Sequence, residues 1–255
     1  MPALKRRRVP HAAIAHLCNA DPVLARVIEV VGPYRLEPQR DRSPYEHLSR
    51  AVAHQQLNGT AANTILRRFV ASFGEGVSFP SPEQVLAAPT AALRGAGFSG
   101  SKILALRDLA AKALEGVVPQ ADELDPLDDV QIIERLTSVR GIGRWTVEMM
   151  LMFQLGRPDV LPVDDFGVRN GFRLAYGLRK LPAPRALAAF GARWAPHRTA
   201  AAWYLWRAVD LAKESRLPRP RAPPPRLRVP ARKRKKLSRA AAASARRPRS
   251  GARTR

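Results

Sequence analysis

The sequence predicts an all-α body followed by a basic tail, and three observations lead to this fold class. Apolar residues repeat at the 3.6-residue period of helices along most of the chain. No segment sustains the alternation of apolar and polar residues, rich in Val, Ile and Thr, that indicates strands. After Leu217 the composition changes abruptly to Pro, Arg, Lys, Ala and Ser. Such a segment cannot bury a core, so we expect residues 218–255 to form a disordered tail.

Charge is the unusual property of the composition. The 255 residues contain 44 Lys and Arg against 21 Asp and Glu, a net charge of +23, which favours a polyanionic partner. Sixteen of the basic residues, with no acidic residue, lie between Arg216 and Arg255. A single cysteine, Cys18, excludes an internal disulfide and a four-thiolate iron–sulfur cluster. No apolar run reaches the roughly 20 residues needed to span a bilayer, and no hydrophobic signal core follows the basic leader at 1–10, so we expect no membrane partner.

Three helix starts in the N-terminal half combine a capping residue with proline. Asp21-Pro22, Ser43-Pro44 and Ser81-Pro82 each offer a side chain to the free amides of a first turn, and proline has no amide to satisfy. Glu46 follows Ser43 at the spacing of a capping box. The helices expected here are His11–Cys18, Asp21–Val31, Ser43 to about Gln56, Thr60 to Val70, short ones from Ser81 and from Pro89, and Ser101–Leu114.

The C-terminal half continues the helical pattern. Asp128-Asp129 begins a helix that leads into Gly141-Ile142-Gly143, and a nearly apolar helix follows from Val147 to Leu155. The remaining helices are expected near Gly167–Ala175, Pro184–Trp194 and Arg198–Lys213.

The Gly-x-Gly turn between two helices is a candidate anion site. Turn amides and the N-terminus of the second helix can converge there on a phosphate. Val139 and Ile142 would hold the turn against the core, while Arg140 and Arg144 would face a nucleic-acid backbone. On the spacing alone, however, an ordinary helix–helix corner with a glycine cap is the better interpretation.

A resemblance changes that interpretation. The motif Gly141-Ile142-Gly143-Arg144-Trp145-Thr146, followed by Leu161-Pro162-x-Asp164-Asp165-Phe166, resembles the helix-hairpin-helix DNA glycosylase superfamily, in its 3-methyladenine-DNA glycosylase II (alkylpurine) branch. Further matches are Tyr45 to Gln56 with its Gln-Gln-Leu ending, Gly97-Phe98-Ser99-x-x-Lys102, and Trp194-x-Pro196-x-Arg198 leading to Trp206. The similarity extends from about Asp21 to Leu211 and implies a compact, two-lobed form without the N-terminal sheet subdomain of the bacterial type II enzyme.

The resemblance makes Asp165 the catalytic residue. From its position alone, each of Asp164 and Asp165 is better explained as a helix N-cap, and Asp164 keeps that role of cap or support. An alkylated purine leaves as a neutral base, so a fixed carboxylate need only stabilise the oxocarbenium-like sugar or orient water. No metal is needed for catalysis, and the resemblance implies at most a monovalent cation at the hairpin as a cofactor.

Further roles follow from the same resemblance. Trp145 stands where bifunctional relatives carry a Schiff-base lysine, so we predict hydrolysis without strand cleavage. The expected base pocket consists of Trp206, Phe166 and Tyr45. The expected DNA-binding residues are Gln55, Gln56 and Leu57 in an intercalating loop, with either Gln56 or Leu57 as the plug, and Arg140, Gly141, Gly143, Arg144, Trp145 and Thr146 at the hairpin.

Other aromatic and titratable residues have simpler explanations. Trp194 and Trp203 fit core packing better than a base pocket. His54 and His197 are expected at the surface or in structural positions, because no cluster of Cys and His suggests zinc.

The resulting expectation is a monomeric repair enzyme for double-stranded DNA containing alkylated bases, with lobes at 45–165 and at 11–44 plus 166–217. It would act in the bacterial cytoplasm at the nucleoid, or in the nucleus of a eukaryote. The alternatives are a noncatalytic helix-hairpin-helix DNA-binding protein and a glycosylase for another lesion, such as oxidised guanine or mismatched adenine. The tail is interpreted as an electrostatic arm for DNA, and the competing interpretation is a solvated extension without function.

Overall fold

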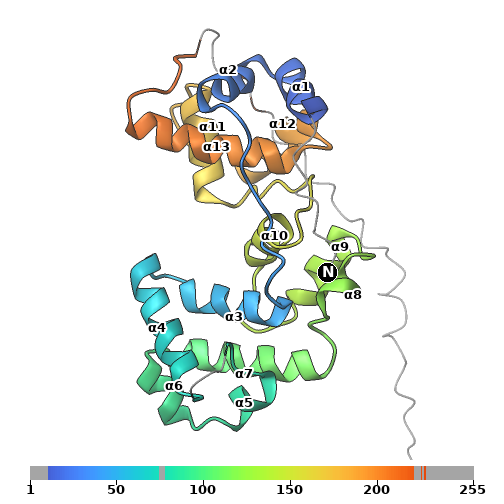
Figure 1. Ribbon diagram of the computed structural model, residues 1–255. Helices are drawn as coiled ribbons and strands as arrows, with labels where there is room; N and C mark the ends of the chain where they lie inside the picture. The colour runs from blue at the N-terminus through green and yellow to red at the C-terminus, as the bar shows by residue number, and fades with distance from the viewer. Residues whose placement is uncertain (1–10, 75–77, 221–224, 226, 228–255) are drawn as a thin grey trace, which may run out of the picture.

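The computed structural model in Figure 1 describes residues 11–74, 78–220, 225 and 227. Throughout these residues the regular elements are helices, which confirms the predicted all-α class. They are α1 (His11–Ala20), α2 (Pro22–Val31), α3 (Pro44–His54), α4 (Gly59–Ala71), α5 (Pro82–Ala87), α6 (Thr90–Ala96), α7 (Gly100–Leu114), α8 (Ala121–Leu124), α9 (Asp129–Leu136), α10 (Arg144–Phe153), α11 (Phe166–Ala175), α12 (Pro184–Gly191), the 3-10 turn η1 (Ala192–Trp194) and α13 (Arg198–Lys213). The predicted leader and most of the predicted tail lie outside the described residues.

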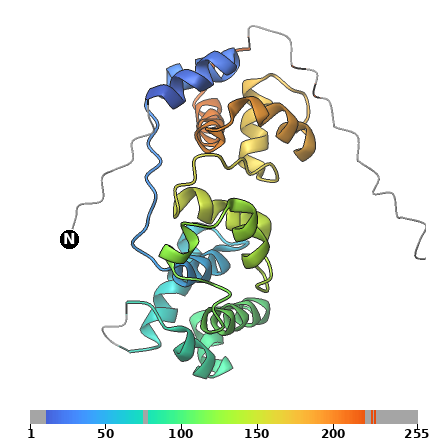
Figure 2. The ribbon, with the colours of Figure 1, turned by 90° about the vertical axis from the view of Figure 1, so that its right-hand side faces the viewer.

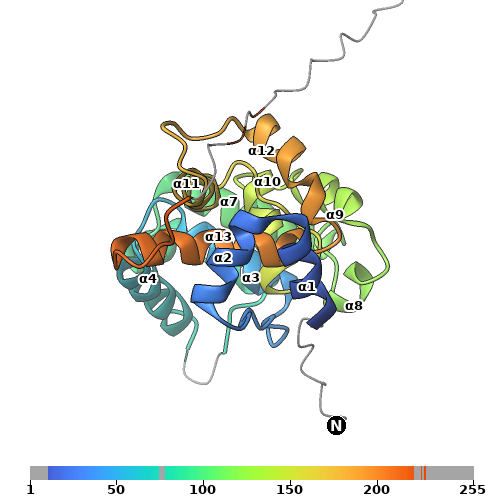
Figure 3. The ribbon, with the colours of Figure 1, turned by 90° about the horizontal axis from the view of Figure 1, so that it is seen from above.

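The helices form two lobes, one above the other in Figure 1. We call α3 to α10 the hairpin lobe, and α1, α2 and α11 to α13 the terminal lobe. In the terminal lobe α13 packs against both α11 and α2, so helices from the two ends of the described chain share one core. The view from above in Figure 3 places this lobe over the hairpin lobe. In Figure 1, α10 is the helix of the hairpin lobe that lies nearest the terminal lobe.

The chain crosses between the lobes twice, and the two crossings are bonded to each other. Figure 2 shows the first crossing as an extended segment that leaves α2 and reaches α3. Its Gln39 N–H donates to the carbonyl of Phe153, at 2.7 Å, and the side-chain amide of Gln154 donates back to the carbonyl of Arg42, also at 2.7 Å. Gly156, at φ +68°, lies so near Pro38 that a Cβ there would be 2.6 Å from the proline Cγ. The crossings therefore hold each other where the lobes meet.

The predicted helix starts are largely confirmed. The Asp21 carboxylate accepts the amides of Val23 and Leu24, and Ser81 forms a complete capping box with Gln84. Ser43 accepts the amide of Glu46, as predicted.

The capping box predicted at Ser43 is incomplete, however. The Glu46 carboxylate lies 2.8 Å from the Arg50 guanidinium and 3.8 Å from that of Arg42, instead of reaching back to the Ser43 amide. Two nearby cations attract this carboxylate more strongly than one backbone N–H.

Other boundaries shift by a few residues. Helix α3 ends at His54 rather than near Gln56, α4 begins after an Asn58 cap, and a 3-10 turn replaces the last turn of the helix predicted to reach Trp194. The short helix α8 was not predicted. No helix within residues 11–74 and 78–220 is both long and apolar enough to cross a membrane.

Close contact between α11 and α13 positions the site. A side chain at Gly171 of α11 would collide with the backbone carbonyl of Leu205 on α13. Only glycine permits this approach. The first turn of α11 is thereby brought beside Trp206, the residue after Leu205.

Candidate active site

Asp165 lies at the junction of the two lobes, immediately before α11. Its Oδ1 accepts the Val168 amide at 2.7 Å and the Trp206 indole N–H at 2.8 Å. Its Oδ2 accepts the Trp145 indole N–H at 2.8 Å. Because the donors belong to α10, α11 and α13, both lobes hold the carboxylate. A carboxylate has about four acceptor positions, so one position on Oδ2 stays available.

The cap of α11 is Asp165 itself, which corrects the prediction of that role for Asp164. Only the second aspartate is at the N-cap position, with extended backbone and its side chain on the Val168 amide. Asp164 is exposed to solvent.

Gly167 gives the indole of Trp206 room beside the carboxylate. A Cβ at this glycine would lie 2.7 Å from Trp206 Cδ1 and 3.1 Å from Asp165 Oδ1. On its other side the indole stacks on Phe153, with ring centroids 5.7 Å apart and planes 25° apart. Sequence reasoning missed Gly167, although a glycine in a first helical turn, where propensity disfavours it, was an available signal.

The other predicted aromatic residues fall in two different places. Phe166, the residue after Asp165, is 67% exposed. Trp145 is 46% exposed and donates to Asp165. Tyr45 is buried instead, and its ring edge packs against Phe79 in the hairpin lobe, with centroids 6.2 Å apart. The structure gives Tyr45 this core position rather than one beside Asp165, which corrects its assignment to the base pocket.

The hairpin between α9 and α10 has the predicted anchors. Val139 and Ile142 are buried, and Gly141 has φ +77°, a conformation that favours glycine. A Cβ at Gly143 would meet open space, and this residue caps α10 without a side chain. Amides of the first turn of α10 are therefore left for an anion.

Side chains on α7 hold the other face of the hairpin. The Arg140 amide donates to Asp108 Oδ2 at 2.7 Å, and the Lys112 ammonium donates to the Ser138 carbonyl at 2.5 Å. Neither contact was predicted, because α7 carries no signal that relates it to the glycine turn.

Arg144 and Glu148 form an ion pair across one turn of α10. The distance from Nε to Oε1 is 2.8 Å, and the Glu148 side chain is only 3% exposed against 62% for Arg144. Burial raises the pKa of Glu148, the Arg144 charge opposes that rise, and the charges of Asp164 and Asp165 add to it. A buried carboxylate thus orients an exposed guanidinium near the catalytic candidate. Sequence reasoning missed this role of Glu148.

The remaining predicted DNA contacts differ in exposure. Gln56 and Leu57 are exposed, whereas Gln55 donates its side-chain amide to the Gly141 carbonyl at 2.8 Å. Thr146 is 5% exposed, so its side chain is directed into the core and only its backbone amide, in the first turn of α10, is left for DNA.

The sequence profile described as HhH-GPD superfamily base excision DNA repair protein matches residues 49–197, more than half of the chain. The chain belongs to the HhH-GPD superfamily.

Two relatives within this superfamily match nearly their whole length. DNA-3-methyladenine glycosylase 1 of Schizosaccharomyces pombe is 43% identical over 209 residues, which are 81% of this chain and 90% of the relative. A solved structure of the S. pombe 3-methyladenine DNA glycosylase in complex with abasic DNA covers 79% of this chain and 98% of its own, with a TM-score of 0.71. The DNA-3-methyladenine glycosidase structure from Bacillus halodurans has 32% identity and a TM-score of 0.72, covering 83% of this chain and 95% of its own.

Two tryptophans outside the site lie in or against the core of this HhH-GPD chain. Trp194 is fully buried and donates to Asp21, and Trp203 packs against Tyr34, so both tryptophans have the predicted core roles. His54 is exposed. Within the described ranges, no group of His, Cys, Asp and Glu is arranged to hold a metal ion.

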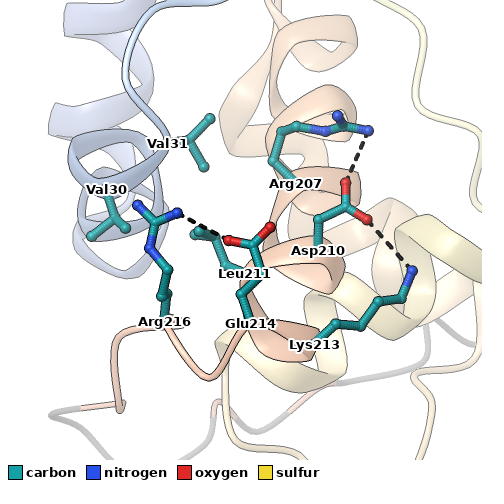
Figure 4. Close-up of a pocket in the computed structure, with 8 residues that line it drawn as sticks. All are labelled: Val30, Val31, Arg207, Asp210, Leu211, Lys213, Glu214 and Arg216. Carbon is teal, nitrogen blue, oxygen red and sulfur yellow. Dashed lines mark hydrogen bonds and ion pairs between the residues drawn. The ribbon is translucent and has the colours of Figure 1, made fainter.

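A hollow on the HhH-GPD fold, away from Asp165, is lined mainly by charged side chains. Figure 4 shows this space of about 410 Å³ between the ends of α2 and α13, where Asp210 bridges Arg207 and Lys213 and Glu214 pairs with Arg216. Each of its charged side chains is in an ion pair with another, and Asp165 and Trp206 do not line the hollow. We therefore place the candidate site at Asp165.

Proposed function

We propose that this chain is a monofunctional DNA glycosylase that flips alkylated purines out of the duplex and hydrolyses their N-glycosidic bonds. The observation that carries the proposal is the carboxylate of Asp165, fixed by three donors from both lobes, with one acceptor position open. The S. pombe and B. halodurans relatives, named for 3-methyladenine, support this substrate class.

The chemistry requires little more than such a carboxylate. Alkylation at N3 or N7 makes the purine cationic, so the base departs neutral and the positive charge moves to the sugar. A carboxylate that is already in place stabilises the positive charge that develops on the sugar in the transition state, because the protein does not have to reorganise during the reaction. The indoles of Trp145 and Trp206 prevent the carboxylate from rotating away. The open position on Oδ2 can face the sugar cation or hold the water that captures it.

The absence of a lyase step follows from Trp145 in this proposal. An indole N–H donates a hydrogen bond but cannot form a Schiff base with the sugar. Here it donates to Asp165 itself. The product is therefore an abasic site in an uncut strand. The S. pombe relative was solved in complex with abasic DNA.

DNA binding is assigned to the hairpin side of the molecule. The uncapped first turn of α10 and the exposed Arg144 offer amides and a guanidinium to a phosphate. Among the described residues, the carbonyls of Thr137 and Ile142 accept no hydrogen bond, so they are available to a monovalent cation, which we propose for the hairpin. The protein would act on double-stranded DNA as a monomer.

The test measures base release from duplexes that contain 3-methyladenine, 7-methylguanine or ethenoadenine. We expect release by the natural protein and by Asp164→Asn, and a strong loss in Asp165→Asn. Undiminished release by Asp165→Asn would overturn the catalytic assignment. Tight binding without release from any alkylated duplex would support the noncatalytic alternative, and release of 8-oxoguanine alone would support a different lesion.

A further inference from the structure

One side-chain hydrogen bond connects the two segments assigned to DNA contact. Gln55 and Gly141 are 86 residues apart in the chain, and the Gln55 Nε2 donates to the Gly141 carbonyl oxygen at 2.8 Å. We call residues 55–58, between α3 and α4, the wedge loop. The bond therefore joins the wedge loop to the hairpin.

Helix α7 supports both partners of this bond. The Lys102 ammonium donates to the carbonyl of Ala53 at 2.8 Å, which fixes the end of α3 directly before the wedge loop. About one turn further along α7, Ala105 lies against Gly141, where an added Cβ would be 3.1 Å from the Ala105 Cβ. Asp108 then holds the Arg140 amide. Helix α7 thus contacts both the end of α3, directly before the wedge loop, and the hairpin. The hydrogen bond from Gln55 to Gly141 then joins these two segments directly.

The outer part of the wedge loop has a different environment. Gln56 has φ +59°, a left-handed conformation that is uncommon and costly for a residue other than glycine. Leu57 is 40% exposed although it is a large apolar residue. Gln55 is held inward while its two neighbours are presented to solvent.

We propose that Gln55 is a positioning residue that keeps the wedge loop in register with the hairpin, so that both engage one duplex together. The inference rests on the proposed function and adds a role that differs from insertion into DNA. A plug must enter the stack at a fixed distance from the phosphate held by the hairpin. If the loop moved independently, binding at the hairpin would not drive Gln56 and Leu57 into the duplex, and extrusion of the base would become slower.

The test compares excision of 7-methylguanine from two duplexes by Gln55→Met and Gln55→Glu. Both variants keep the length of the side chain but cannot donate to the Gly141 carbonyl, and methionine adds no charge. In one duplex the lesion is paired with cytosine, and in the other it lies opposite a mismatched base that weakens its pairing. We expect single-turnover excision from the paired duplex to fall about tenfold, the rate equivalent of one hydrogen bond. Excision from the mismatched duplex should fall less than about threefold, because an unpaired base needs little help to leave the stack.

Gln84→Glu is the matched control. This glutamine acts only through its side-chain oxygen, which accepts the Ser81 amide in the α5 capping box, so a glutamate preserves its role. The control should keep the natural rates on both duplexes. The ratio of the two rates is taken within one protein sample, so a reduced folded fraction in a variant cancels.

Equal losses on both duplexes, or natural rates on both, would overturn the positioning role. A natural protein that releases no alkylated base would instead overturn the proposed function. An excision-competent natural protein with unaffected Gln55 variants would overturn only this inference.

Discussion

Asp21 and Asp165 accept the same kinds of hydrogen bond but differ in their exposure to solvent. Asp21 caps α2 and accepts the Trp194 indole N–H at 3.0 Å, while Asp165 caps α11 and accepts the indole N–H of Trp145 and of Trp206. Each carboxylate therefore combines a helix cap with tryptophan donors.

The difference lies in burial and in unused acceptor capacity. Asp21 is 2% exposed, and it accepts two amides on Oδ1 and the Tyr176 hydroxyl and the Trp194 indole on Oδ2. All of its roughly four acceptor positions are occupied. Burial, together with the Asp21 charge, raises the pKa of Tyr176 well above its ordinary value. Asp165 is half-buried and uses three positions. Indole donors therefore fix the position of an aspartate, while exposure and one free acceptor position make it available for chemistry.

The largest expected effect separates the two residues by activity. Asp165→Asn removes the charge but keeps a good N-cap, so we expect excision to fall by about 10²–10³-fold while the free energy of unfolding changes by less than about 1 kcal/mol. Single-turnover base release and urea unfolding measure the two quantities. A large loss of stability with little loss of rate would reverse the roles that the comparison assigns.

Asp21→Asn tests the same comparison from the structural side. The amide would still cap α2 but would direct a donor at the Tyr176 hydroxyl and the Trp194 indole, so two buried donors lose their acceptor. We expect the free energy of unfolding to fall by about 3 kcal/mol. The excision rate per folded molecule should stay within about twofold of the natural rate. A specific loss of catalysis at natural stability would contradict the structural role.

Trp145→Phe changes the number of donors on Asp165 from three to two. Phenylalanine keeps an aromatic ring but leaves Oδ2 without its hydrogen bond, so we expect about a tenfold slower excision at saturating enzyme. Trp203→Phe is the matched control, because Trp203 packs on Tyr34 and Arg207 without contacting Asp165. Equal rates in the two variants would show that the indole N–H does not hold the carboxylate in place.

The smallest effect is expected from removal of residues 218–255, because the hydrogen bonds described above for Asp21 and Asp165 come from other parts of the chain. Loss of the basic tail should weaken binding to undamaged duplex and flatten the dependence of log Kd on log salt, since fewer counterions are released. Single-turnover excision at saturating enzyme should stay unchanged. An unaltered salt slope would favour a solvated extension over an electrostatic arm.

Local signals in the sequence predicted most of the fold. Asp21-Pro22 and Ser81-Pro82 mark their helices correctly because capping depends on neighbours within one turn. Glu46 shows the limit of such reasoning, since it has the spacing of a capping box but pairs with Arg42 and Arg50. A motif states which partners are near in sequence, not which one attracts the side chain most.

Site residues could be predicted from the sequence only where they belong to a recognised motif. Asp165 was singled out by resemblance, and its role stays a prediction. Gly167 acts through Trp206, 39 positions later, and Gln55 acts through Gly141, 86 positions later. Tyr45 was misplaced because an aromatic residue in a helical pattern fits a pocket and a core equally well. These relations depend on packing between distant segments, which no local spacing encodes.

The bonded crossings between the lobes determine which partner must deform when DNA binds. Rotation of one lobe against the other would break the bonds of Gln39 and Gln154 and separate Pro38 from Gly156. Together with the hydrogen bond from Trp145 to Asp165, these contacts restrict changes in the distance between the hairpin and Asp165. Duplex DNA has a persistence length of about 150 base pairs, yet it can be kinked locally at a cost of a few kcal/mol. When DNA binds, it is therefore the duplex that bends or kinks. Sites whose base stacking is already weakened by damage need less deformation energy.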